Sequence, residues 1–350
     1  QLMNGQRKIM SNKPGGWQGA VFAPCFIRDQ GLLCLAQRTE ETMKKGRTHN
    51  KAVLKKYFPV YLMAFPGLLY LFINNYMPLP GLVLAFKKYN AKKGIWGSSW
   101  VGLKNFKFLF ATNDAFIITR NTLFYNIVFI IVNTVAAIAV AIILAEMRHK
   151  IKKFYQSAIL LPYMLSMVIV SYLVFAFLST ENGFINSTIL PLLGKERISW
   201  YMEKKYWPFI LIFVNLWKTI GYNCIVYMSA IIGFDRGFYE AAAIDGAGKW
   251  QQITRITIPM LKPTIIMMTL LSIGRIFYSD FGLFYQVPQN SGALYPVTNT
   301  IDTYVYRGLL ELGNISLSAA AGLYQSVIGF ILVLGTNLWV RKIDPDNALF

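Results

Sequence analysis

The 350-residue sequence has few of the side chains that carry most catalytic chemistry. It contains three cysteines, two histidines and 16 aspartates and glutamates. Cys25 and Cys34 are nine residues apart, which fits no zinc spacing, so we expect the cysteines to be free thiols. This composition leaves little material for a nucleophile–base pair or a metal site. Neither kind of centre is expected in this chain.

Charge of either sign is also scarce. Charged residues make up 15% of the chain, whereas soluble domains contain about 25%. Hydrophobic residues make up 55%, and the mean hydropathy is +0.42. These values exclude a disordered chain, disfavour an ordinary soluble enzyme and are typical of a polytopic membrane protein.

What the sequence does contain is long stretches without charge, each long enough for a membrane helix of about 20 residues. Four such stretches carry no charge, a fifth carries only Lys218, and a sixth is interrupted by Arg275 and Asp280. We predict an all-α protein with six transmembrane helices, within residues 57–343. The six predicted spans are 57–86, 121–145, 154–180, 206–234, 262–284 and 312–340.

The distribution of basic residues predicts the orientation. With six spans both termini lie on one side, which carries 21 lysines and arginines, against 11 on the other side. The positive-inside rule therefore makes both termini cytoplasmic. Residues 1–56 are predicted to form a basic, partly disordered leader, and residues 344–350 a short tail. The net charge of +19 is then mostly a topology signal, which removes the nucleic-acid interpretation that it would have in a soluble protein.

Residues 239–259, on the predicted cytoplasmic side, carry the most specific pattern. An alanine-rich stretch from Glu240 predicts a short helix over 240–244. Gly246 allows a turn, and a second short helix is expected from Gly248 until Pro259 stops it. Such an element would be a rigid protrusion that fits a groove on a partner. A plain loop with helical propensity would explain the alanines but not the whole spacing.

This spacing resembles the EAA motif of binding-protein-dependent ABC importer permeases: Glu-Ala-Ala, three residues, Gly, nine residues, then Ile-x-apolar-Pro. Three other segments resemble the sugar-importing branch. They are the sequence VGLKNF at 101–106, NGFIN at 182–186, and IGRIFYSDF at 273–281, which is similar to the subgroup that imports oligosaccharides from complex polysaccharides. The resemblance covers residues 57–343 and implies a type I ABC importer permease fold in a bacterial inner membrane.

The resemblance also implies the partners. Such a permease works with a second homologous permease, here expected to form a heterodimer, with two ATPase subunits and with an extracellular or periplasmic binding protein. The chain has no Gly-x4-Gly-Lys-Ser/Thr match, so it is expected to bind no cofactor and to leave ATP and Mg²⁺ to the ATPases. The residues implied in coupling to the ATPase are Glu240, Ala241, Ala242, Asp245 and Gly246.

The fourth predicted span places four polar residues on one helical face. Asn215, Lys218, Thr219 and Tyr222 recur at i, i+3, i+4 and i+7. Polar side chains in a span usually face a cavity or a partner, and this face suits sugar hydroxyls. In maltose-type permeases the sugar-contacting residues lie on this span, so the resemblance implies the same role. A face that hydrogen bonds to a neighbouring helix is the alternative.

The charges inside the spans are the remaining candidates for substrate binding. An unpaired cation there is unfavourable by roughly 2.5–3.5 kcal/mol. Arg275 could pair with Asp280 or with an acid of the partner permease. Alternatively, Lys218 and Arg275 could bind the carboxylates of an acidic sugar, such as an alginate or pectin fragment. The predicted function is oligosaccharide import, with a peptide or amino acid importer as the alternative.

Overall fold

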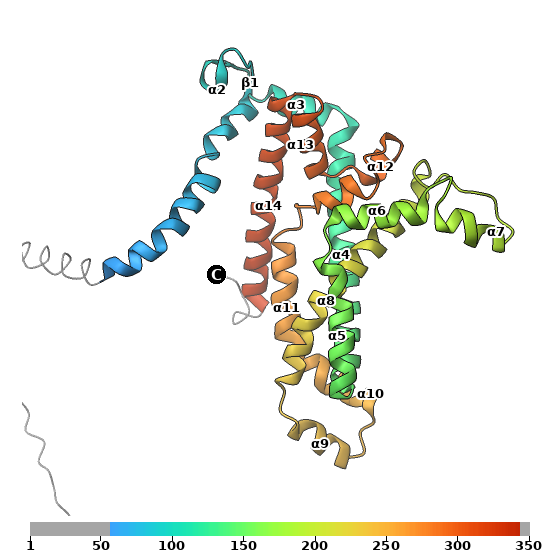
Figure 1. Ribbon diagram of the computed structural model, residues 1–350. Coiled ribbons are helices and arrows are strands. Elements are labelled where there is room, and N and C mark those ends of the chain that lie inside the picture. Colours follow the sequence, from blue (N-terminus) through green and yellow to red (C-terminus); the bar gives the residue numbers. More distant parts are fainter. Residues whose placement is uncertain (1–56, 344–350) are drawn as a thin grey trace, which may run out of the picture. The chain divides into compact units, whose positions relative to one another are not determined.

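A computed structural model describes residues 57–343 (Figure 1). The predicted leader and tail lie outside these residues. The described chain is mostly helical, and its strands are one two-residue pair, β1 (Lys87–Lys88) with β2 (Ser99–Trp100). Five helices of the described residues are long and apolar enough to cross a membrane, and the number is six if a bent pair of helices is counted as one span. The predicted all-α fold is confirmed. The five helices are Tyr57–Phe86, Asn113–Glu146, Lys204–Ile232, Lys249–Ile273 and Ile315–Lys342.

The chain divides into two units after Met77. The described part of the first unit is an apolar helix that contains the π turn η1 (Phe72–Tyr76). The second unit begins at Pro78, continues through the 3-10 helix η2 (Leu79–Phe86) and holds all the other elements.

Helices α4 (Asn113–Glu146) and α8 (Trp207–Ile232) form the centre of the second unit and pack extensively on each other. At one end their contact is filled by an aromatic cluster that includes Tyr125, Phe129, Trp207 and Phe284. At the other end smaller side chains, among them Ala137, Ala141 and the buried free thiol of Cys224, fill the contact. A third cluster joins α3 (Lys104–Ala111) and α4 to α14 (Ile315–Ile343).

The predicted span over 154–180 is divided into two helices, α5 (His149–Met164) and α6 (Met167–Leu178), which meet at 96°. Pro162 lies in the last turn of α5, and the hydroxyl of Ser166 accepts a hydrogen bond from Ile169 N–H at the start of α6. Gly221 allows α8 to lie against α5, because a Cβ there would overlap the carbonyl of Ile159.

The predicted span over 262–284 also differs from the structure. The helix begins earlier, with α10 (Lys249–Gln252), passes through the π turn η5 (Ile253–Thr257) and continues as α11 (Ile258–Ile273). We predicted that Pro259 would end a helix, but it lies in the first turn of α11. Proline lacks an N–H but fits a first helical turn. The charged stretch at 275–280 lies after the helix, in non-helical backbone.

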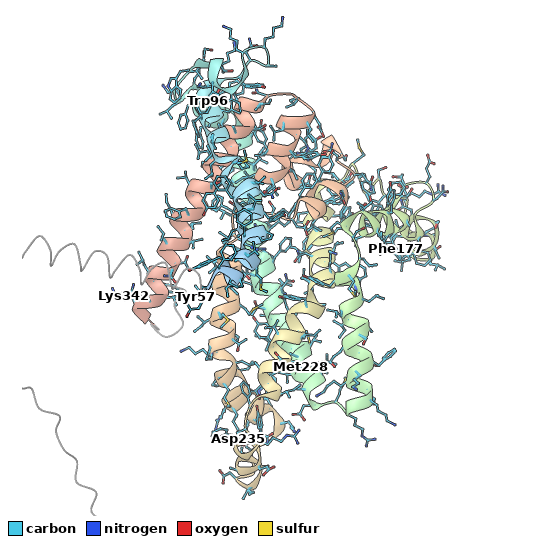
Figure 2. All side chains as sticks on the ribbon, turned by 60° about the vertical axis from the view of Figure 1, so that its left-hand side comes forward. Tyr57, Trp96, Phe177, Met228, Asp235 and Lys342 are labelled. Carbon is cyan, nitrogen blue, oxygen red and sulfur yellow. The ribbon has the colours of Figure 1, made fainter. Side chains whose placement is uncertain are left out.

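The segment between α11 and α14 contains short elements that lie at the opposite end of the unit from α9 (Gly237–Ile244) (Figure 1). These are the π turn η6 (Gly282–Gln286), η7 (Gly292–Leu294), α12 (Tyr295–Thr298) and α13 (Ile301–Leu310). We call residues 282–310 the outer cap. In Figure 2 the label of Asp235 marks the end of the unit near α9, and the label of Trp96 marks the other end.

Candidate coupling surface and translocation cavity

The predicted coupling residues lie together on an exposed element. Asp235 precedes α9, and its Oδ1 accepts a hydrogen bond from the N–H of Gly237, the first residue of the helix, at 2.9 Å. The helix ends before Gly246, which has φ +80°, a left-handed conformation that favours glycine. Three large apolar side chains of this region are mostly exposed: Phe238 at 56%, Ile244 at 86% and Trp250 at 75%. Exposed apolar groups clustered on a protrusion are typical of an interaction surface.

Polar contacts connect this element to the spans. The hydroxyl groups of Tyr239 and Thr257 hydrogen bond at 3.1 Å. Lys249 Nζ forms an ion pair with Glu146 at the end of α4, at 2.8 Å, the one salt bridge within residues 57–343. Both side chains are mostly exposed, so the pair adds little stability. A cleft of about 940 Å³ lies between α9 and the ends of α4, α5 and α8, and α9 therefore projects from the spans.

A second cavity, of about 240 Å³, lies among α4, α8 and the end of α11. Its polar lining consists of amides and hydroxyls plus one charged side chain, that of Arg275. Two predicted residues, Asn215 and Arg275, belong to this lining. The other lining residues were not predicted. They are Asn126, Phe129, Ile130, Asn133, Thr134, Asn223, Tyr227, Met268, Ser272 and Tyr278.

The sequence contains a pattern that could have predicted the asparagines of this cavity. Asn126 and Asn133 are seven residues apart in a run without charge, so they share a face of α4. Asn133 Nδ2 donates a 2.8 Å hydrogen bond to Asn215 Oδ1 across the two helices. A search for charges passes over neutral amides, although they too are expensive within a span and point to a cavity or partner.

The predicted polar face of α8 is divided between different neighbours. Lys218 Nζ donates hydrogen bonds to the carbonyl oxygens of Tyr163 and Leu165, at the end of α5. The ring of Tyr222 stacks on Tyr163, with centroids 5.1 Å apart. Thr219 Oγ1 donates to the carbonyl of Asn215. These three residues do not line the cavity, and a substrate-binding role for them stays a prediction.

Arg275 and Asp280 do not pair with each other. Asp280 Oδ1 instead accepts a hydrogen bond from Leu283 N–H at 3.1 Å, at the start of η6. The guanidinium of Arg275 is exposed at the cavity and has no hydrogen bond or ion pair within the described residues. Of the three counter-charges considered for Arg275, Asp280 is not its partner within the described residues. An acid of a partner subunit and the carboxylate of an acidic substrate remain.

In the outer cap, Arg307 is buried, with 6% of its surface exposed. Its Nε donates to Asn290 Oδ1 at 2.8 Å, and its Nη1 donates to Asn299 Oδ1 at 2.7 Å. The guanidinium also lies over the ring of Tyr295, 4.0 Å from the centroid. Burial lowers the pKa of Arg307. These contacts hold a turn in which Gln289 and Asn290 have positive φ.

Comparison with known proteins identifies the fold and the family. Residues 137–345 match the model of the family described as binding-protein-dependent transport system inner membrane component. The chain is 34% identical to the protein LplB of Bacillus subtilis, over 85% of this chain and 92% of that one. It is 35% identical to the polygalacturonan/rhamnogalacturonan transport system permease protein YteP of the same organism, over 87% and 94%.

A solved structure agrees with these relatives. It is of a bacterial ABC transporter involved in the import of the acidic polysaccharide alginate, and the match has a TM-score of 0.75 at 30% identity. It covers 83% of this chain and 98% of the other. A second structure, of a bacterial alginate ABC transporter with an alginate pentasaccharide-bound periplasmic protein, gives a TM-score of 0.74 at 30% identity. The predicted permease fold and transport role are confirmed, and the chain belongs to the family of inner-membrane components of binding-protein-dependent transport systems.

Proposed function

We propose that this chain is a permease subunit of an ATP-driven importer that moves acidic oligosaccharides, and that Arg275 binds their carboxylates. The observation that carries this proposal is the guanidinium of Arg275, which has no hydrogen bond or ion pair within residues 57–343 and lines a cavity whose other polar groups are neutral. An unpaired cation at such a site is unfavourable unless a ligand supplies the counter-charge. A guanidinium is also suited to binding a carboxylate through two parallel hydrogen bonds.

The neutral part of the lining suits the hydroxyl groups of a sugar. Asparagine side chains can both donate and accept hydrogen bonds, and Asn126, Asn133, Asn215 and Asn223 all contribute. Asn133 Oδ1 is buried without a hydrogen-bond partner within the described residues, and it could accept from a hydroxyl after a small rearrangement. Lys218 is less suited to the substrate because its ammonium already donates to two carbonyl oxygens.

The names of similar proteins support a saccharide rather than a peptide or an amino acid. One relative is named for polygalacturonan and rhamnogalacturonan, and the structural neighbour is described as importing alginate. Galacturonan and alginate are polymers of uronates, and each uronate unit carries a carboxylate. A fragment of such a polymer would supply the counter-charge that Arg275 lacks.

The partners follow from the same assignment. The chain would act with a second, homologous permease, two ATPase subunits that bind ATP and Mg²⁺, and an external binding protein. Helix α9 and the turn at Gly246 would dock in a groove of one ATPase, with Phe238, Ile244 and Trp250 as the apolar contacts. Both termini would then be cytoplasmic, because a chain with six spans would place them on the same side as the loop between the fourth and fifth spans, which carries α9.

The proposal is tested by the uronate preference of the importer reconstituted with its partners in proteoliposomes. We define this preference as the uptake efficiency for a galacturonate oligosaccharide divided by that for its carboxyl-reduced, neutral counterpart. Efficiency is the maximal uptake rate over the concentration of loaded binding protein that gives half that rate. Each probe is supplied at a concentration that saturates the binding protein, so that the preference reflects the permease. We expect Arg275→Gln to lower it at least about tenfold, because a hydrogen bond to a charged group contributes roughly 1.5–3 kcal/mol.

Lys104→Gln, which removes a cation of the short helix α3 outside the cavity, is the control and should leave the preference unchanged. Equal uptake efficiency of the two probes by the unmodified importer would overturn the acidic-substrate proposal. A preference that survives Arg275→Gln would assign the carboxylate to another residue.

A further inference from the structure

The backbone that carries Arg275 into the cavity is not helical. After α11 ends at Ile273, residues 274–277 form turns, residues 278–280 have no regular structure, and Phe281 leads directly into η6. We call residues 274–281 the break segment. Backbone groups released from a helix within a membrane protein must find other partners, because lipid offers none. Where these groups bond therefore decides how firmly Arg275 and Tyr278, the two lining residues of this segment, are held.

Side chains from three other helices bind the break segment. Asn126 of α4 donates from Nδ2 to the carbonyl oxygens of Ile276, at 2.8 Å, and Tyr278, at 3.3 Å. Gln325 of α14 is buried, with 5% exposed, and donates from Nε2 to the carbonyl of Phe277 at 2.7 Å. Three consecutive carbonyl groups are thus bonded to side chains that are remote in the sequence.

Asp302, in the first turn of α13, completes this set of contacts. Its Oδ2 accepts hydrogen bonds from Ser279 N–H at 2.7 Å and from Ser279 Oγ at 2.9 Å. Its Oδ1 accepts from Gln325 Nε2 at 3.1 Å. The carboxylate therefore binds the break segment directly and also orients the amide that holds Phe277. Hydrogen bonds to an ionised acceptor are roughly twice as strong as neutral ones.

We propose that Asp302 is a positioning residue for the substrate cavity, which fixes the break segment so that Arg275 meets the substrate in a single geometry. This proposal rests on the assignment of Arg275 to a substrate carboxylate. Asp302 lies in the outer cap and is not among the residues that line the cavity. It would act through the backbone of the break segment, and a shift of about 1 Å in a binding group is enough to reduce its effect strongly.

The competing explanation is that Asp302 only stabilises α13. An acidic residue in the first turn interacts favourably with the helix dipole, and Thr300 and Thr303 already cap this helix through their hydroxyl groups. A purely structural role would lower the amount or the thermal stability of the importer. It would not change which of two probes the importer prefers.

The experiment is a double-mutant cycle of Asp302→Asn and Arg275→Gln, with the uronate preference as the readout. Asn keeps the size of Asp but cannot accept from both Ser279 donors and Gln325 as the carboxylate does. We expect Asp302→Asn alone to lower the preference by roughly three- to tenfold, with little change in the maximal rate for the neutral probe. In the Arg275→Gln background the same change should alter the preference by less than about twofold, because the two residues act as one unit.

Asp114→Asn is the matched control, since Asp114 is an exposed acid in the first turn of α4 that does not contact the break segment. It should leave the preference unchanged. If Asp302→Asn does not accumulate in the membrane, Ser279→Ala and Gln325→Leu remove the same contacts from the other side and should give a smaller loss of the same sign.

The outcomes separate the two proposals. An unmodified importer without a uronate preference would overturn both. Suppose that the unmodified importer shows the uronate preference. If Asp302→Asn then leaves this preference unchanged, or lowers it equally with and without Arg275, the positioning role is overturned. The acidic-substrate proposal would stay in place.

Discussion

At the scale of single residues, Lys218 lies within a span, and its ammonium group bonds to backbone carbonyl oxygens. Its ammonium donates to the carbonyl oxygens of Tyr163 and Leu165, at the end of α5. These carbonyl groups lack helical partners because the chain bends by 96° after Met164. A cation at the C-terminal end of a helix also complements the helix dipole. Lys218 therefore stabilises the bend between α5 and α6.

We predict that Lys218→Met destabilises the importer and leaves its substrate preference unchanged. The substitution keeps an apolar stem of similar length but leaves the two carbonyl oxygens without their donor, at a cost of about 1–3 kcal/mol. The measurements are the thermal stability of the purified complex and the uronate preference in proteoliposomes. Lys218→Arg, which keeps the donors, is the control. Unchanged stability with a lost preference would make Lys218 a substrate ligand, as the sequence pattern suggested.

The residues of the cavity could be predicted only in part. Asn215 and Arg275 were found because a polar or charged side chain in a span is expensive and suggests a cavity. Asn126, Asn133 and Asn223 satisfy the same physical rule but were passed over in a search for charge. The partners of Lys218 were not predicted, because they depend on where α5 ends. Pro162 and Ser166 mark that position, but the prediction did not use them to divide the span.

At the scale of elements, the presence of the spans followed from hydropathy, while their ends did not. The prediction ended a helix at Pro259, whereas the chain stays helical from Lys249 to Ile273. A π turn over Ile253–Thr257 precedes this proline, so that Pro259 occupies a first turn, where its missing N–H is harmless. Hydropathy measures the transfer of side chains into lipid and carries no information on such local hydrogen-bond patterns.

The turn between α9 and α10 contains two glycines, Gly246 and Gly248, and the second serves as a control for a prediction about the first. Gly246 has φ +80°, whereas Gly248, two residues later, has φ −67°. Alanine at position 246 must adopt a left-handed conformation, which costs about 1–2 kcal/mol, or change the turn between α9 and α10. We expect Gly246→Ala to reduce uptake by severalfold and Gly248→Ala to have little effect, with both proteins inserted equally in the membrane. Gly246→Pro, which cannot adopt this φ, should abolish uptake.

Uptake in vesicles, together with the amount of each variant in the membrane, is the measurement. Equal uptake by the Gly246→Ala and Gly248→Ala variants would show that the left-handed turn is not needed for coupling. Normal uptake by the Gly246→Pro variant would overturn the assignment of this element to ATPase coupling.

At the scale of the whole molecule, one continuous helical segment joins the coupling surface to the cavity. Residues Lys249–Ile273 begin just after the turn at Gly246 and end at the break segment that carries Arg275 (Figure 1). At 1.5 Å per residue, a helix of 25 residues is roughly 38 Å long. Pro263 lies inside α11 without ending it, and we infer that the segment moves as a unit. A displacement of α9 by the ATPase would then be transmitted to Arg275 without any large change within the segment.

We therefore predict that a break within this helix separates ATP hydrolysis from transport. Met267 lies in α11 with 54% of its surface exposed, so its side chain fills no core position. Proline there removes a backbone hydrogen bond and disrupts the helix at a cost of about 3 kcal/mol. Met267→Pro should keep ATP hydrolysis that responds to the loaded binding protein and lose most oligosaccharide uptake, while Met267→Ala should keep both. Uptake by the Met267→Pro variant at the level of Met267→Ala would show that α11 does not transmit the motion, and the connection between the coupling surface and Arg275 would then have to run through α8.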